Sequence, residues 1–114
     1  MKLESVGKHL KEKLKDPYFK ELYELEEQKL DIVKRIVDYR VKHGLNQKQL
    51  AQRVGVTQQH ISKIEGGDFA NVMTLEKLLL AIGYTVQMKV IQLKPSLAVQ
   101  ILRTMRSKRQ AQAA

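Results

Sequence analysis

Two adjacent amide side chains, Gln58 and Gln59, are followed closely by Ser62 and Lys63. A glutamine amide donates and accepts hydrogen bonds, so it can pair with the N6/N7 edge of adenine, whereas a lysine ammonium prefers the O6/N7 edge of guanine. On a helix, Gln59, Ser62 and Lys63 share one face, with Gln58 at its exposed N-terminal end. These four residues are therefore predicted to contact base edges in the major groove of DNA. The alternative is a solvated surface helix that happens to carry glutamine.

The helix that carries these side chains needs a second helix to position it, and the sequence of residues 46–65 predicts two short helices in succession. Asn46 can cap the first helix with its side-chain oxygen, and Gln49, three residues later, completes a reciprocal capping box. Gly55 follows this helix, at a point where a left-handed backbone costs a residue without Cβ very little. Thr57 can cap the second helix. This order of signals indicates a helix-turn-helix.

Helical segments also precede this motif. Asp16 can cap a helix whose first turn accepts Pro17, and no further Gly or Pro occurs before Gly44. The apolar spacing in between fits either one long helix or two helices joined near residues 26–29. We expect residues 1–15 to be weakly helical or frayed.

After the motif, the sequence predicts a loop, a helix and then a strand. Residues 69–73 are predicted to form a loop, after which Thr74 caps an apolar helix that ends at Gly83. Residues 84–90 then alternate apolar and polar side chains, which indicates a half-buried β-strand within residues 84–93. A single strand leaves its N–H and C=O groups unpaired, so we expect it to pair with a second copy of the chain in a homodimer. The predicted dimerisation residues are Tyr84, Val86, Met88 and Val90.

The last segment, residues 94–114, is a basic tail. Pro95 can start an amphipathic helix there, which carries Arg103, Arg106, Lys108 and Arg109. Such a helix could bind phosphates, a protein partner or a membrane surface. The alternative is a solvated tail that frays after Ser107.

The charge of the chain favours a polyanionic partner. Its 114 residues include 21 Lys/Arg and 12 Asp/Glu, a formal net charge of +9. Residues 1–31 have a net charge of −1 and residues 32–114 a net charge of +10, so the positive charge coincides with the motif and the residues after it. The absence of cysteine excludes disulfides and thiolate zinc sites. The sequence contains no run of 18 apolar residues, so it predicts no membrane-spanning helix. We expect a cytoplasmic protein on the nucleoid.

No residue pattern in the chain predicts catalysis. The three histidines, His9, His43 and His60, are scattered, and no set of nucleophile, base and orienting group occurs. No spacing of His, Asp and Glu suggests a metal site either. We therefore expect neither an enzyme nor a bound cofactor or metal.

The stretch from Gly44 to Gly66 resembles the lambdoid phage repressor and Cro family, the xenobiotic-response-element (XRE) type of helix-turn-helix. The elements Leu-Asn-Gln, Leu-Ala-Gln, Val-Gly-Val-Thr-Gln-Gln and Ile-Glu-Gly occur there in the same order and spacing. The resemblance implies an all-α, lambda-repressor-like bundle, to which we add the C-terminal strand and helical or flexible tails. It also implies a structural ion pair between Arg40 and Glu65. The residues expected at DNA phosphates are Asn46, Gln47, Arg53 and His60.

Before the motif, a charged helical extension begins with Asp-Pro-Tyr-Phe-Lys-Glu-Leu-Tyr, and after it the expected strand directly follows Thr-Leu-Glu-Lys-Leu-Leu-Leu-Ala-Ile-Gly. These flanking segments resemble HigA-type antitoxins, with a HipB-like terminal strand. The resemblance implies a dimer that binds double-stranded operator DNA, represses its own operon and neutralises a cognate toxin. It implies a toxin that is a ribonuclease of the RelE/HigB kind, with a HipA-like kinase as the alternative.

The candidate toxin contacts are Tyr18, Phe19, Leu22 and Tyr23, because these apolar groups exceed what a small core can absorb. They could instead pack on their own domain. One alternative function is a stand-alone repressor of prophage type without a toxin partner. Another is a protein-interaction adaptor in which the helix-turn-helix is only a scaffold.

These expectations divide the chain into four parts. Residues 1–28 form a charged helical extension, residues 29–83 the helix-turn-helix domain, residues 84–93 the dimerisation strand and residues 94–114 the basic tail.

Overall fold

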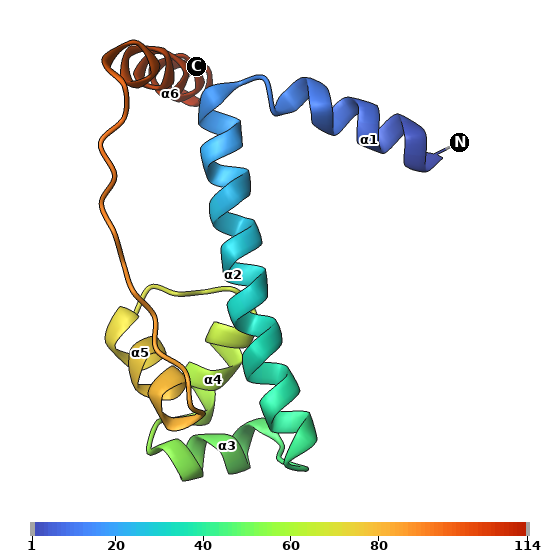
Figure 1. The fold of residues 1–114 in the computed structure, drawn as a ribbon, viewed down its shortest axis with the longest axis vertical. Coiled ribbons are helices and arrows are strands. Elements are labelled where there is room, and N and C mark those ends of the chain that lie inside the picture. The colour runs from blue at the N-terminus through green and yellow to red at the C-terminus, as the bar shows by residue number, and fades with distance from the viewer. Residues whose placement is uncertain (1, 114) are drawn as a thin grey trace. The chain divides into compact units, whose positions relative to one another are not determined.

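The structure is a computed structural model, which describes residues 2–113 and the side chains of residues 6–108. The described chain contains six helices (Figure 1): α1 (Lys2–Lys13), α2 (Pro17–Lys42), α3 (Gln47–Val54), α4 (Gln58–Glu65), α5 (Val72–Ala81) and α6 (Pro95–Ala113). It divides into two compact units: unit 1 comprises residues 1–26 and 90–114, and unit 2 comprises residues 27–89. None of the helices in the described residues is long and apolar enough to cross a lipid bilayer.

Unit 2 is built around one apolar core. Its four largest fully buried side chains are Ile36, Leu50, Ile61 and Leu78, one each from α2, α3, α4 and α5. Burying such a side chain contributes about 1.5–3 kcal/mol to the free energy of folding. These four side chains therefore hold the four helices together at the centre of the unit. The other buried members are Ala51, Val54, Ile64, Leu75, Leu79 and Ile82.

The long helix α2 is continuous, which decides between the two alternatives left open by the sequence. It begins at Pro17, as predicted, and the Tyr18 N–H donates to Asp16 Oδ1 at 3.0 Å. No Gly or Pro interrupts it, and it ends before Gly44, whose φ of 63° is in the left-handed region. The capping signals at the two ends therefore determined the length of this helix.

The start of α5 differs from the prediction. Asn71 is the N-cap, and its side chain accepts a hydrogen bond from the Thr74 N–H at 3.0 Å. The predicted cap, Thr74, is therefore inside the helix, and part of the predicted loop is helical. The physical reason is that Asn is a stronger N-cap than Thr, so the earlier of two nearby capping residues is used.

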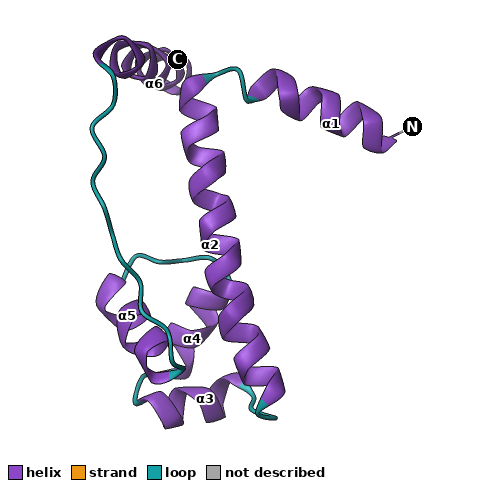
Figure 2. Cartoon of the chain, viewed as in Figure 1, coloured by secondary structure: helices purple, strands orange, loops and turns teal. Residues whose placement is uncertain are grey.

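The prediction of a β-strand over residues 84–93 is wrong. The described residues contain no strand, and residues 84–94 form a loop between α5 and α6 (Figure 2). The alternating side chains do not define a buried face: Val86 packs against the core of unit 2, but Met88 is 75% exposed and Val90 fully exposed. A strand is stabilised by hydrogen bonds to a neighbouring strand, and the described chain has no second segment of this kind.

The beginning of this loop is held by an arginine. The Arg35 guanidinium lies over the Tyr84 ring, 5.4 Å from its centroid, and Arg35 Nε donates to Asp31 Oδ2 at 3.1 Å. The hydrogen bond to Asp31, followed by that to Tyr84, raises the pKa of Arg35 above its ordinary value. Arg35 therefore remains charged and can hold Tyr84 by a cation–π contact.

Unit 1 combines α1, the first turns of α2, and α6. Lys108 of α6 lies over the Tyr18 ring at 5.1 Å, and its Nζ is 3.8 Å from Asp16 Oδ2. Lys13 of α1 lies 5.6 Å from the centroid of Phe19. Among its described side chains, unit 1 has no fully buried apolar residue. Contacts between cations and aromatic rings therefore stabilise this unit together with partly buried apolar side chains.

Candidate nucleic-acid interface

The first helix of the motif begins and ends as its sequence predicts. Asn46 Oδ1 accepts from the Gln49 N–H, and Gln49 Oε1 accepts from the Asn46 N–H, both at 2.8 Å. This confirms the capping box at the start of α3. Gly55 has a φ of 83° at the end of α3, and its N–H donates to the Ala51 carbonyl. The left-handed glycine turns the chain sharply towards α4.

The second helix presents the amides to solvent. Thr57 caps α4 by accepting from the His60 N–H at 3.2 Å. Two buried isoleucines of α4 face the core, whereas Gln58, Gln59, Ser62 and Lys63 are all exposed. The residues predicted to contact bases thus share one accessible surface on a rigidly packed helix. Because both adjacent glutamine amides are open to solvent, each can pair with a base edge.

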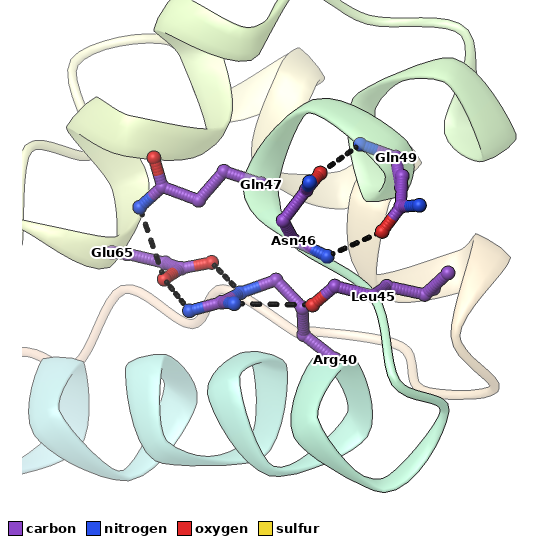
Figure 3. A network of polar contacts seen from close by, with 6 residues as sticks. All are labelled: Arg40, Leu45, Asn46, Gln47, Gln49 and Glu65. Carbon is purple, nitrogen blue, oxygen red and sulfur yellow. Dashed lines mark hydrogen bonds and ion pairs between the residues drawn. The ribbon is translucent and has the colours of Figure 1, made fainter.

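A polar network joins α2, α3 and α4 (Figure 3). Arg40 Nε and Nη2 donate to the two carboxylate oxygens of Glu65, each at 3.0 Å, and Arg40 Nη1 donates to the Leu45 carbonyl at 3.1 Å. The side chain of Glu65 is only 8% exposed and that of Arg40 20%. This forked geometry is the strong form of an arginine–carboxylate pair. It ties the end of α4 to α2.

Gln47 takes part in the same network. Its Nε2 donates to Glu65 Oε1 at 3.3 Å, and its side chain is half-buried. The residues are 18 positions apart, so no local sequence pattern predicts this contact. Gln47 is also one of the residues expected at a DNA phosphate. The contact with Glu65 fixes its side chain at the N-terminal end of α3, where a backbone phosphate is favoured by the helix dipole.

The other residues expected at phosphates lie in three different settings. Asn46 is exposed but its side-chain oxygen is used by the capping box. Arg53 is exposed on α3, where its Nη1 donates to Tyr39 Oη at 3.3 Å. His60 is half-buried in a shallow depression beside Lys63 and the start of α5. Of the three, Arg53 is the one that carries a permanent positive charge, and it is exposed.

The turn between α3 and α4 has a partner that the sequence analysis missed. Lys77 of α5 donates from its Nζ to the Gly55 carbonyl at 3.1 Å. A lysine near the end of a helix commonly satisfies a free carbonyl there. The interacting residues are again far apart in sequence, so only the folded chain reveals that α5 supports the turn.

The residues expected to bind a toxin or a second chain lie outside this interface. Tyr18, Phe19, Leu22 and Tyr23 are on the first turns of α2 in unit 1, where Leu22 is 44% exposed. Phe19 and Tyr23 stack with their ring centroids 6.2 Å apart. The four residues expected in dimerisation belong to the loop after α5.

Comparison with known proteins agrees with this geometry. Residues 36–88 match the family model described as helix-turn-helix. The matched segment includes the whole of α3, α4 and α5 together with the end of α2. No solved structure matches the chain. Over residues 36–88 the chain is therefore similar to helix-turn-helix domains, and this similarity supports a DNA-binding regulator of the XRE type.

Proposed function

We propose that the protein is a sequence-specific repressor that binds operator DNA as a homodimer, and that it serves as the antitoxin of a type II toxin–antitoxin system. In this proposal it represses its own operon and neutralises a ribonuclease toxin of the RelE/HigB kind. The protein itself carries out no catalysis.

The exposed amide face of α4 is the observation that carries the proposal. Gln58, Gln59 and Lys63 project from a helix whose opposite side is fixed in the core by Ile61 and Ile64. Such a helix fits the major groove, and its end is held by the Arg40–Glu65 network. One helix of this length reads few base pairs, so a dimer on two half-sites roughly 34 Å apart would give useful specificity.

The test of DNA recognition uses DNA from the promoter upstream of the gene and a random duplex of equal length. Gln58→Ala and Gln59→Ala should each weaken promoter binding by about 1–3 kcal/mol and leave binding to random DNA nearly unchanged. Arg53→Gln, which removes an exposed charge of α3 expected at a DNA phosphate, is the control and should weaken both duplexes alike. If both alanine variants kept the full ratio of promoter to random affinity, the assignment of α4 as the reading helix would be wrong.

Unit 1 supports the antitoxin part of the proposal. It lies outside the segment matched by the family, and its described apolar side chains are only partly buried. Leu22 and Leu25 remain 44% and 53% exposed on α2. Apolar groups of this kind on a helix face are suited to docking a protein partner.

Co-purification with the product of the neighbouring gene tests this part. Leu22→Glu should abolish co-purification and toxin neutralisation while leaving promoter binding intact. Leu30→Glu is a matched control, since Leu30 is also on α2 and 63% exposed. Loss of the complex with both variants, or with neither, would contradict the assignment of Leu22 to the toxin contact.

A stand-alone repressor is the second candidate, and one observation favours it. The aromatic rings of unit 1 already have partners within the unit: Lys108 lies over Tyr18, and Phe19 stacks on Tyr23. A chain that regulates its promoter without binding any neighbouring gene product would support this second candidate.

A further inference from the structure

The C-terminal third of the chain carries most of the net positive charge, and all but one of its cations lie beyond the segment that matches the helix-turn-helix family. Residues 77–114 contain seven Lys/Arg and no Asp or Glu, whereas residues 1–76 contain fourteen Lys/Arg and twelve Asp/Glu. Most of the net charge of +9 therefore lies at or beyond the second half of α5. Four of the seven cations fall within α6.

Two arginines of α6 face away from the side of the helix that packs. Leu97 and Ile101 are half-buried, and Lys108 contacts Asp16 and Tyr18, so these residues mark the packed side. With 3.6 residues per turn, Arg103 and Arg106 lie roughly 120–180° around the helix from Leu97 and Ile101. Both arginines are exposed.

The two arginines have no carboxylate close enough for an ion pair among the described side chains. They are three residues apart on one helix, so their like charges repel each other. Such a pair is stabilised when an external anion lies across it. An arginine guanidinium also matches the geometry of a phosphate, to which it can donate two parallel hydrogen bonds.

We propose that α6 is a second DNA-binding element, in which Arg103 and Arg106 contact backbone phosphates without reading sequence. This inference rests on the proposed DNA binding by α4 and adds a contact from unit 1. The helix-turn-helix supplies the specificity, and α6 adds affinity by releasing counterions from the duplex.

The composition of α6 favours DNA over a membrane surface. Helices that lie in a membrane interface insert a continuous apolar face, commonly with Trp or Phe. The helix α6 has no aromatic residue, and its apolar residues Leu97 and Ile101 are half-buried. Its exposed apolar residues form no continuous face, because Arg106 lies between Leu102 and Val99 around the helix. Phosphate contacts require only the exposed arginine side, which is available without unpacking the helix.

The experiment compares the full-length protein with Arg103→Gln/Arg106→Gln by fluorescence anisotropy on promoter and random duplexes over a range of salt concentrations. Each phosphate contact contributes roughly 0.9 to the slope of log K against log salt, so the slope should fall by about 1.8. At about 0.1 M salt both affinities should fall on the order of tenfold to a hundredfold, and their ratio should not change. Glutamine is a good helix former, and circular dichroism verifies that α6 still folds.

Two further variants separate local contact from net charge. Lys8→Gln/Lys11→Gln removes the same charge from two exposed residues of α1, within the segment of residues 1–31 whose net charge is −1, and should leave the slope unchanged. Arg103→Lys/Arg106→Lys keeps the charge and should keep the slope. An equal loss of slope in the α1 variant would overturn the inference, because the effect would then depend on overall charge alone.

The remaining outcomes distinguish the inference from the proposed function. If the wild-type protein prefers promoter DNA but the glutamine variant keeps its salt slope, α6 does not touch DNA and only the inference fails. If the wild-type protein shows no preference for promoter DNA, the proposed function fails first. Sedimentation with phosphatidylserine vesicles that is lost in the glutamine variant, with an unchanged DNA slope, would assign the arginines to a membrane and overturn the inference.

Discussion

Replacing the carboxylate of Glu65 should destabilise unit 2 far more than the loss of a surface charge. In Glu65→Gln the side chain keeps its shape but loses its charge, and an amide nitrogen then faces a donor of Arg40. The carboxylate accepts from two Arg40 nitrogens at 3.0 Å and from Gln47 at 3.3 Å. Breaking one partner of a buried pair costs about 3–5 kcal/mol. Arg40 is still 20% exposed and keeps its bond to the Leu45 carbonyl, so we expect about 2–4 kcal/mol.

Urea unfolding followed by circular dichroism measures this cost, and a double-mutant cycle isolates the pair. Arg40→Gln should also destabilise the protein, and the double variant should lose less than the sum of the two, with a coupling of about 2 kcal/mol. Asp31→Asn is the control, since the Arg35–Asp31 pair is exposed and its removal should leave the urea midpoint unchanged. Additive single effects, or a midpoint for Glu65→Gln equal to that of Asp31→Asn, would refute the reasoning.

Further predictions concern the backbone and core of the motif. Gly55→Ala should lower the free energy of unfolding by about 1–2 kcal/mol because the φ of Gly55 is 83°; the added Cβ itself meets only Lys77 Nζ, at an ordinary 3.5 Å. Gly7→Ala should instead raise the helix content measured by circular dichroism, because a Cβ at Gly7 meets nothing within 4 Å. Asn46→Ala should lower the free energy of unfolding by about 1 kcal/mol through loss of the capping box, and a loss too small to measure would contradict its role. Ile61→Ala should cost about 2–5 kcal/mol in urea unfolding and also weaken DNA binding, since Ile61 is fully buried beneath the reading face.

Local signals in the sequence predicted the helix-turn-helix well. The Asn46–Gln49 box, the left-handed Gly55 and the Thr57 cap each depend on residues within one turn of each other, so their chemistry is visible in the sequence itself. The inward position of Ile61 follows from helical periodicity in the same way.

Features that depend on distant residues could not be predicted in the same way. The contacts of Gln47 with Glu65 and of Lys77 with Gly55 join segments separated by most of the motif. The expected strand failed for a related reason: alternation describes which side chains point together but says nothing of whether another strand is present to pair with. At the start of α5 only Thr74 was predicted as the cap, whereas Asn71, which was placed in a loop, is the residue that caps the helix.

The Glu65 network has a consequence for the thermodynamics of DNA association. Glu65 is the last residue of α4, and its carboxylate binds Gln47, the first residue of α3, and Arg40 of α2. The orientation of α3 relative to α4 is therefore set when the protein folds. The conformational entropy of ordering them is then lost on folding and not on meeting the duplex. Calorimetric binding should accordingly show the heat-capacity change of docking a preformed surface, without the larger change that accompanies folding of the motif on DNA.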